Sequence, residues 1–315
     1  MNKKIAIVGA GISGLSCAYF LSDKDYDITI FAKAFSPDIT SNRAAAFWFP
    51  YHIRNDKRGI NWARKSYNFY KGIADDIVTG ISIKPLIKVL RENTVEEEPV
   101  WMEFIPEGTC KKLSKENLAA GVDVAYEILV PLIETQIFLP YLQNILAQKN
   151  VSFEKKLIES FDALSSFDII INCSGLGART LCNDETIYPV RGQVALIKTD
   201  ITRPIYLDNE MPLYLVPRKD AMIVGGTYEE NIFEETTEPT TIEHLLNVAY
   251  GVFPELKQQK VIGSWAGLRP YRNEVRLEQE AGTNIIHNYG HGGSGFTLAF
   301  GCAEEVMQLV ESINL

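Results

Sequence analysis

The segment from Lys4 to Phe31 reads KIAIVGAGISGLSCAYFLSDKDYDITIF, and it decides the fold class. Its first part, Lys4–Val8, is a short run rich in β-branched residues, which is typical of a buried strand. A glycine-rich turn, Gly9–Gly14, follows directly, and Leu15–Leu21 then has the apolar spacing of a helix. Asp27–Phe31 alternates as a second strand does. This β-α-β opening predicts a parallel sheet with a nucleotide site at its edge.

The turn has G-x-G-x-x-G spacing between a strand and a helix, which is the context that gives this pattern its meaning. Gly9 permits the tight turn, Gly11 lets the backbone approach a pyrophosphate, and Gly14 lets the helix pack against the strand. Free N–H groups and the dipole at the helix start then favour phosphates. The motif does not distinguish NAD from FAD. The acid that usually ends the second strand is also missing, because Ala32 and Lys33 stand there.

The composition fits a globular enzyme with 315 residues, 46% hydrophobic residues and a formal net charge of -9. The acidic balance argues against a nucleic-acid partner. Five scattered cysteines without C-x-x-C spacing indicate neither a zinc site nor a disulfide framework. The sequence contains no run of about 18 apolar residues, so it predicts no membrane-spanning helix. The tail Ile313–Leu315 differs from the peroxisomal tripeptide, so we expect a cytoplasmic protein.

Nucleotide-type elements recur near the middle and the end of the chain. Phe167–Asn172 is a continuous apolar run, typical of a buried parallel strand, and a strand is expected over Thr283–Asn288, followed by a glycine-rich turn, Gly290–Gly295, and a helix, Phe296–Ile313. The predicted fold class is α/β, with a Rossmann-like cofactor domain that has a parallel sheet and an inserted mixed-sheet substrate domain. We assign residues 1–50, 140–188 and 276–315 to the cofactor domain, and residues 51–139 and 189–275 to the substrate domain.

The segment Ile286–Thr297, IHNYGHGGSGFT, is the most specific in the chain. A strand ends, four glycines let the backbone press against a flat ligand, and a helix begins. N–H groups at residues 295–297 and the helix dipole would stabilise the negative charge of a reduced flavin. Thr297 would add a hydroxyl hydrogen bond.

The run HNYGHGGSGFTLAFGCA, residues 287–303, closely resembles the signature of the D-amino-acid oxidase and D-aspartate oxidase family. Further segments resemble the family in the same order along essentially the whole chain: GAGISGLS (9–16), AAAFWFPY (44–51), NCSG (172–175), RGQ (191–193), GGT (225–227) and GLRP (267–270). The resemblance implies bound FAD and hydride transfer from the α-carbon of a D-amino acid to flavin N5. It implies 2-keto acid, ammonia and hydrogen peroxide as products, with dioxygen as the electron acceptor.

The resemblance also implies roles for individual residues. Arg269 would pair with the substrate carboxylate, Tyr214 would hydrogen-bond it, and the carbonyl of Gly293 would accept from the amine. The residues expected to bind FAD are Gly9, Ala10, Gly11, Ile12, Ser13, Gly14, Thr40, Ser41, Arg43, Ala45, Ala46, Phe47, Ile158, Ser174, Gly292, Gly293, Ser294, Gly295, Phe296 and Thr297.

Several positions depart from the family pattern. Glu210 stands where a second active-site tyrosine is common, Arg43 replaces an apolar residue of the flavin-facing loop, and Phe49 replaces a residue that is often polar. His52 and Arg54 favour an acidic substrate side chain, whereas Glu210 favours a basic one, so the side-chain preference stays open.

Three alternatives remain at this point. One is a related flavin amine oxidase acting on glycine, sarcosine or D-aspartate, and another is a dehydrogenase with an acceptor other than oxygen. The third is a nucleotide-binding protein without catalysis. No metal is expected, since His287 and His291 lack metal-ligand neighbours in the sequence. Monomer and homodimer both remain open.

Overall fold

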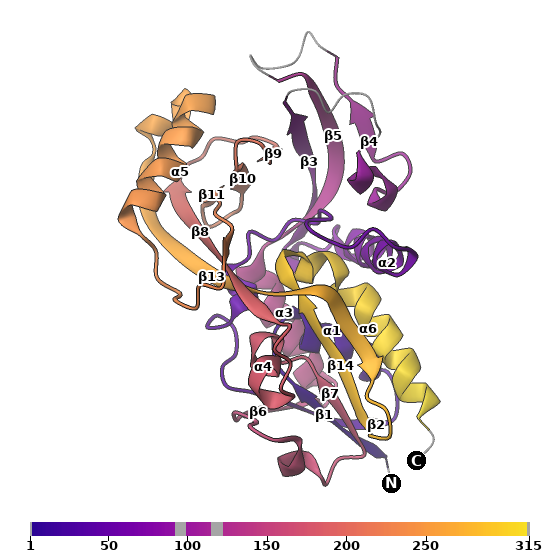
Figure 1. Ribbon diagram of the computed structural model, residues 1–315. Coiled ribbons are helices and arrows are strands. Elements are labelled where there is room, and N and C mark those ends of the chain that lie inside the picture. Colours follow the sequence, from indigo (N-terminus) through magenta and orange to yellow (C-terminus); the bar gives the residue numbers. More distant parts are fainter. Residues whose placement is uncertain (1, 92–98, 115–121, 314–315) are drawn as a thin grey trace.

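The computed structural model describes residues 2–91, 99–114 and 122–313, and it shows one continuous mixed sheet with helices packed on it (Figure 1). Along the sheet the described strands follow the order β4-β5-β3-β9-β10-β11-β8-β13-β14-β7-β1-β2-β6, with β12 added beside β8.

The strands are β1 (Lys3–Val8), β2 (Tyr26–Ala32), β3 (Ile81–Leu90), β4 (Cys110–Lys112), β5 (Val124–Ile133), β6 (Ser152–Lys155), β7 (Ile169–Asn172), β8 (Tyr188–Lys198), β9 (Ile205–Asp208), β10 (Leu213–Pro217), β11 (Met222–Gly225), β12 (Glu229–Glu230), β13 (Lys260–Gln279) and β14 (Ile285–His291). The α-helices are α1 (Ile12–Leu21), α2 (Lys57–Ile73), α3 (Thr135–Gln148), α4 (Ala178–Leu181), α5 (Pro239–Val252) and α6 (Gly295–Ser312).

One end of the sheet is parallel, as predicted from the β-α-β opening. Strands β14, β7, β1, β2 and β6 run in the same direction, with Ile5 opposite Ile28 on β2 and Ile169 on β7. Helices α1, α3 and α6 pack around this layer in the lower half of Figure 1. The central strands are buried on both faces, which explains why they are continuous apolar runs rather than alternating ones.

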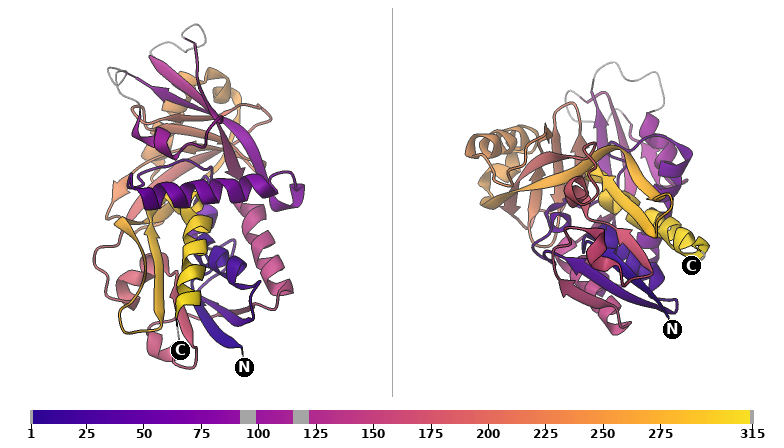
Figure 2. Two further views of the ribbon diagram at one scale, coloured as in Figure 1. Left: turned by 90° about the vertical axis from the view of Figure 1, so that its right-hand side faces the viewer. Right: turned by 60° about the horizontal axis from the view of Figure 1, so that its bottom comes forward.

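The other end of the sheet is largely antiparallel and forms the upper half of Figure 1. Strands β8 to β11 pair antiparallel, and α5 packs against them. Strands β3 and β5 are also antiparallel, paired from Ile81 with Ile133 to Leu90 with Val124. Figure 2 shows α2 lying across the junction between the two ends, where it contacts α6, β3 and β5.

The long strand β13 joins the two ends of the sheet. Its first part pairs with β8 from Lys260 to Tyr271, and its second part pairs with β14. The domain boundary that we expected at residue 276 therefore lies inside a continuous strand. Pairing with Tyr271 also extends β14 to His291, so the expected glycine-rich turn starts two residues later than its sequence suggests.

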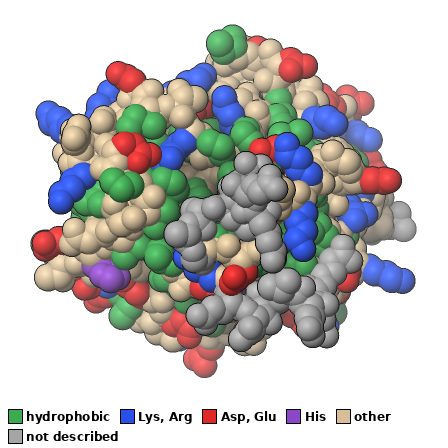
Figure 3. Space-filling model, turned by 90° about the horizontal axis from the view of Figure 1, so that it is seen from above, with side chains coloured by type: hydrophobic (Ala, Val, Ile, Leu, Met, Phe, Trp, Pro, Cys, Tyr) green, Lys and Arg blue, Asp and Glu red, His purple; other side chains and the backbone are tan. Residues whose placement is uncertain are grey.

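The described surface carries both signs of charge. On the face shown in Figure 3, Lys and Arg side chains are interspersed with Asp and Glu side chains. Among the described helices, none is long and apolar enough to cross a membrane.

Candidate functional site

A large cavity of about 1310 Å³ begins where β1, β2 and β7 end. It continues past the start of α6 to side chains on β8, β10 and β13. Ligands of open parallel sheets bind at the carboxyl ends of the strands, which is where this cavity begins. Its volume exceeds the roughly 300–1,000 Å³ of most small-molecule pockets, so it has room for a dinucleotide together with a substrate.

The cavity brings together the residues singled out in the sequence. Every predicted site residue lines it except Gly14 and Ser294. Gly14 packs α1 against the turn, because a Cβ at this position would overlap the carbonyl oxygen of Gly9. Ser294 is buried and donates its hydroxyl hydrogen to the carbonyl of Tyr51, with Oγ and O 2.6 Å apart.

The glycine turn after β1 is shaped for a phosphate group. Gly9 has φ 115°, and a Cβ there would lie 2.8 Å from the carbonyl carbon of Cys173. At Gly11, the N-cap of α1, no side chain caps the helix by a hydrogen bond. Most of the N–H groups of the first turn therefore remain for a ligand, although the N–H of Ile12 donates to Ser41 Oγ at 3.0 Å. This arrangement fits the pyrophosphate of a dinucleotide.

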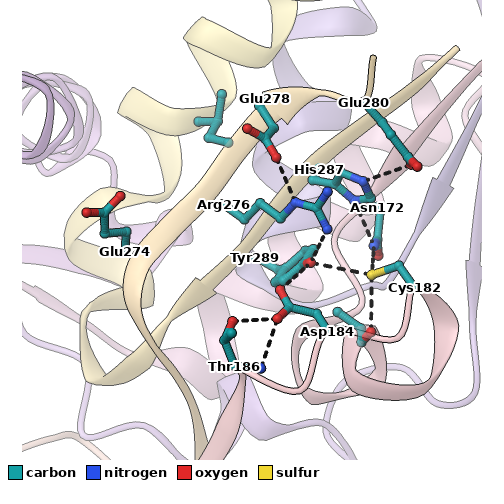
Figure 4. Close-up of polar contacts among 12 residues, drawn as sticks. Asn172, Cys182, Asp184, Thr186, Glu274, Arg276, Glu278, Glu280, His287 and Tyr289 are labelled. Carbon is teal, nitrogen blue, oxygen red and sulfur yellow. Dashed lines mark hydrogen bonds and ion pairs between the residues drawn. The ribbon is translucent and has the colours of Figure 1, made fainter. Parts of the chain in front are cut away.

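Ser174 and Ile158 lie in the part of the cavity beyond β7. The Ser174 hydroxyl donates to Asn172 Oδ1 at 2.6 Å, and Asn172 Nδ2 lies 3.2 Å from His287 Nδ1. His287 Nε2 in turn contacts Glu280 at 3.2 Å, as Figure 4 shows. The buried side chains of Asn172 and His287 thus fix the position of Ser174 in the cavity wall.

Figure 4 also shows a second group of polar contacts beside this one. Tyr289 donates its hydroxyl hydrogen to Asp184 at 2.8 Å. Arg272 pairs with the same carboxylate at 3.1 Å. Burial alone would raise the pKa of Asp184, but hydrogen bonds from Thr186 and Tyr289 and the charge of Arg272 lower it to about 2. This carboxylate therefore remains ionised and stabilises the loop before β8.

Asp38 and Glu159, neither of which the sequence had predicted as a site residue, also line the cavity. Lys33 lies nearby in the same lining. Neither acid forms an ion pair within the described residues, so both carboxylates are available to a ligand.

The loop before α2 is bound to the rest of the site through its backbone. Trp265 Nε1 donates to the carbonyl of Arg43 at 3.0 Å, and Arg218 donates to that of Ala44 at 3.3 Å. Ala46 has φ 57°, a left-handed conformation, while its carbonyl accepts from Ile133 at 2.8 Å. These bonds hold a strained, apolar loop against the middle of the cavity.

The first turn of α6 faces the same part of the cavity. Among the described residues no side chain hydrogen-bonds to cap this helix. The hydroxyl of Thr297 is already used, because it donates to the carbonyl of Phe49 at 2.9 Å. Thr297 is thus left with its backbone N–H for the cofactor, and the sequence had predicted a hydroxyl bond.

Arg269 projects from β13 over a glycine on the neighbouring strand. A Cβ on Gly192 would lie only 2.5 Å from Arg269 Cζ. One guanidinium nitrogen donates to the carbonyl of Thr227 at 3.1 Å, and no described carboxylate lies within ion-pair distance of Arg269. A half-buried cation without a counter-ion is costly, and a bound anion would relieve that cost. The fork of N–H groups suits a carboxylate.

Tyr214 projects from β10 over two glycines at the end of β11. A Cβ on Gly226 would lie 2.7 Å from the Tyr214 hydroxyl, and one on Gly225 would overlap the ring. Burial raises the pKa of Tyr214, and the charge of Arg269 only partly offsets it. The phenol therefore keeps its proton and can donate. The glycines that provide the space for Arg269 and Tyr214 belong to the segments RGQ and GGT, which the sequence indicated only by their resemblance to the family.

Glu210, Arg54 and His52, the residues that left the preference for a substrate side chain open, lie in different parts of the structure. Glu210 does not line the cavity, and its carboxylate accepts from the backbone N–H of Arg91 at 3.2 Å. Arg54 pairs with Glu274 and Asp56 outside the cavity. His52 does line it, and its ring stacks on Tyr228 with centroids 5.0 Å apart. Of these three residues, only His52 lines the cavity, and burial together with the charge of Arg269 lowers the pKa of its imidazole, so the ring is neutral near pH 7.

The two histidines of the second glycine motif are both buried. Burial lowers the pKa of His291 to about 4, so its ring is neutral near pH 7. No group of three or more metal-binding side chains occurs within the described ranges.

Comparisons with known proteins agree with this geometry. The model of the DAO family, described as FAD dependent oxidoreductase, matches residues 4–309. The chain is 34% identical to a D-amino-acid oxidase of Rubrobacter xylanophilus, an alignment that covers 97% of this chain and 95% of the relative. It is 32% identical to a D-amino-acid oxidase of Dictyostelium discoideum, covering 98% and 91%.

The fold is also known from solved structures. A glycine oxidase from Geobacillus kaustophilus superposes with a TM-score of 0.84 at 20% identity, covering 100% of this chain and 96% of that one. At this identity the likeness concerns the fold alone.

Proposed function

The chain belongs to the DAO family of FAD-dependent oxidoreductases, and we propose that it oxidatively deaminates D-amino acids to 2-keto acids and ammonia at the cavity described above. The observation that carries this proposal is Arg269, a guanidinium without a described counter-ion in the same cavity as the dinucleotide turn. The same cavity would therefore hold both the cofactor, at the glycine turn, and the carboxylate of the substrate, at Arg269.

The residues present fit FAD. The turn at Gly9 and the start of α1 would hold its pyrophosphate, and Ser174 and Ile158 would lie beside its adenosine half. Asp38 and Glu159 are the candidates for the ribose hydroxyls, in place of the acid missing at Lys33. The first turn of α6 would stabilise negative charge at the pyrimidine end of the flavin ring. When bound, FAD supplies the acceptor for the hydride from the substrate α-carbon.

Arg43 contacts Trp265 through both its backbone and its side chain. Its carbonyl accepts from Trp265, and its guanidinium lies 6.0 Å from the centre of that indole ring. No described acid pairs with it. We assign this charge to the cofactor rather than to the substrate, because Arg43 belongs to the loop that lines the middle of the cavity.

The protein's own task is to hold the amino acid in one orientation. Arg269 would pair with the carboxylate through two N–H groups, and Tyr214 would donate a third hydrogen bond. Gly293 lies beside Arg269, since its Cβ position is 3.3 Å from Arg269 Cδ, and its carbonyl would accept from the amine. These contacts together would orient the substrate α C–H for transfer to the cofactor, and such orientation can supply much of the rate enhancement.

Three finer statements are also part of the proposal. Dioxygen would be the electron acceptor, giving hydrogen peroxide. The division into a cofactor domain (1–50, 140–188 and 276–315) and a substrate domain (51–139 and 189–275) accords with the parallel and antiparallel ends of the sheet. A cytoplasmic location accords with five free cysteines, and a homodimer is the assembly to test against a monomer.

The test is anaerobic mixing of the FAD-loaded protein with D- and L-amino acids while the flavin absorbance is recorded. Bleaching by D-amino acids, but not by their L-enantiomers, is expected. Reduction by a dinucleotide and by neither enantiomer would refute the proposal. Readmission of air, with a peroxide assay, then distinguishes an oxidase from a dehydrogenase, and a panel with glycine, sarcosine and D-aspartate separates the related amine oxidases.

A further inference from the structure

Tyr51 lies at the substrate end of the cavity, although the sequence analysis assigned it no role. Its ring covers the Gly293 backbone: the point where a Cβ on Gly293 would lie is 2.9 Å from Tyr51 Cδ1 and 3.3 Å from Arg269 Cδ. The aromatic ring and the arginine stem therefore meet over the glycine whose carbonyl is assigned to the substrate amine. Tyr51 is thus placed beside two of the three groups that would hold the substrate.

The backbone of Tyr51 is fixed by the start of α6. Its carbonyl accepts from Ser294 at 2.6 Å, and its N–H donates to the carbonyl of Phe49 at 2.9 Å. The same Phe49 carbonyl accepts from Thr297 at 2.9 Å. Because Ser294 precedes α6 and Thr297 lies in its first turn, these bonds hold Tyr51 close to both the start of α6 and Gly293.

The two tyrosines and the arginine also act on one another electrostatically. Burial raises the pKa of Tyr51, and the charge of Arg269 partly offsets this rise, as it does for Tyr214. Tyr51 in turn raises the pKa of Tyr214. Both phenols are therefore protonated donors near pH 7, and both lie close enough to the Arg269 guanidinium to interact with its charge.

The Tyr51 hydroxyl has no hydrogen-bond acceptor within the part of the chain that the structure describes, while the residue lines the cavity. The second active-site tyrosine that is common in the family is absent here, because its position is occupied by Glu210. The Glu210 carboxylate accepts from the Arg91 backbone and does not line the cavity. A donor next to a cation, open to a cavity and without a protein acceptor, is suited to an anion.

We propose that Tyr51 donates a hydrogen bond to the substrate carboxylate and completes, with Arg269 and Tyr214, a three-residue clamp. The proposal rests on the proposed function. Its members come from the loop before α2, from β10 and from β13, so the carboxylate would be held from separate parts of the fold. Substrate capture then needs no tyrosine at position 210.

The experiment uses the FAD-loaded Tyr51→Phe variant, which loses only the hydroxyl. The probes are 3-phenylpropanoate, which is phenylalanine without its amino group, and the neutral 3-phenylpropanamide, each titrated while the flavin absorbance is followed. A hydrogen bond to a charged group predicts roughly 10- to 100-fold weaker binding of the carboxylate. The amide, which has no charge, should lose much less. The KM for a D-amino acid should rise in parallel, with FAD content and melting temperature unchanged.

Tyr250→Phe is the matched control, because Tyr250 lies on α5 outside the cavity. Carboxylate binding and KM within about twofold of the wild type in Tyr51→Phe would overturn the proposal. An equal loss for the acid and the amide would also overturn it, since that result indicates packing rather than charge recognition. If the wild type itself is not reduced by any D-amino acid, the proposed function fails first, which is a separate and visible outcome.

Discussion

Replacing Gly192 with alanine tests whether the position of one guanidinium controls the reaction. A Cβ at residue 192 would lie 2.5 Å from Arg269 Cζ and 2.6 Å from Arg269 Nη1. Unbonded carbon atoms normally approach to about 3.5–4.0 Å, so the guanidinium must move by about 1 Å or more. Because the obstructed atoms are the far end of a flexible side chain, this movement should not unfold the protein.

The displaced guanidinium should instead reduce the rate of catalysis. A misplacement of about 1 Å at a positioned group can reduce the rate on the order of 100-fold, which corresponds to about 2.7 kcal/mol of transition-state stabilisation. We therefore expect kcat/KM for a good D-amino acid to fall about 100-fold in Gly192→Ala. FAD content and the melting temperature should stay close to those of the wild type.

Steady-state kinetics with the FAD-loaded variant provide the assay, and Gly251→Ala provides the control. A Cβ on Gly251 has no neighbour within 4 Å, and the residue lies on α5 outside the cavity. Full activity in Gly192→Ala, together with a structure in which the guanidinium has not moved, would refute the reasoning. Loss of FAD from that variant would show that the glycine serves the cofactor rather than Arg269.

Three further predictions concern the charge, the cofactor turn and the acid limit of stability. Arg269→Ala should retain FAD but reduce kcat/KM by roughly 30- to 5,000-fold, because removing one partner of a desolvated ion pair costs about 2–5 kcal/mol. Kinetics together with the flavin spectrum check this, and activity equal to that of the wild type would exclude the role proposed for Arg269. Gly14→Ala should lose FAD affinity, since its methyl group would overlap the Gly9 carbonyl; FAD titration of the purified variant measures the loss, and wild-type affinity would contradict the prediction. The pKa of Asp184 is lowered to about 2, so its contribution to the free energy of unfolding, on the order of 2 kcal/mol, is present above about pH 4 and is lost as the pH falls toward 2. Asp184→Asn should therefore be less stable at neutral pH, and its free energy of unfolding in urea should fall less steeply between pH 4 and pH 2. A fall as steep as that of the wild type would rule out this contribution.

Sequence patterns were sufficient where the physical cause is local. The turn at Gly9 was predictable because a left-handed φ and a close strand-to-helix approach both require glycine, and its sequence neighbours supply the strand and the helix. The apolar run before Asn172 likewise predicted a buried parallel strand. The ends of elements were less accurate, since β14 continues to His291 only because β13 pairs with it.

The sequence by itself determined the class of fold, the nucleotide turn and, through family resemblance, the chemistry expected of Arg269 and Tyr214. Only the tertiary structure decided which other residues join them. Tyr51 is far in sequence from Gly293 but packs on it, and Glu210 is near Tyr214 but turns toward Arg91. The physical reason is that a side chain's neighbours across a cavity depend on strand register and loop packing, which no local spacing encodes.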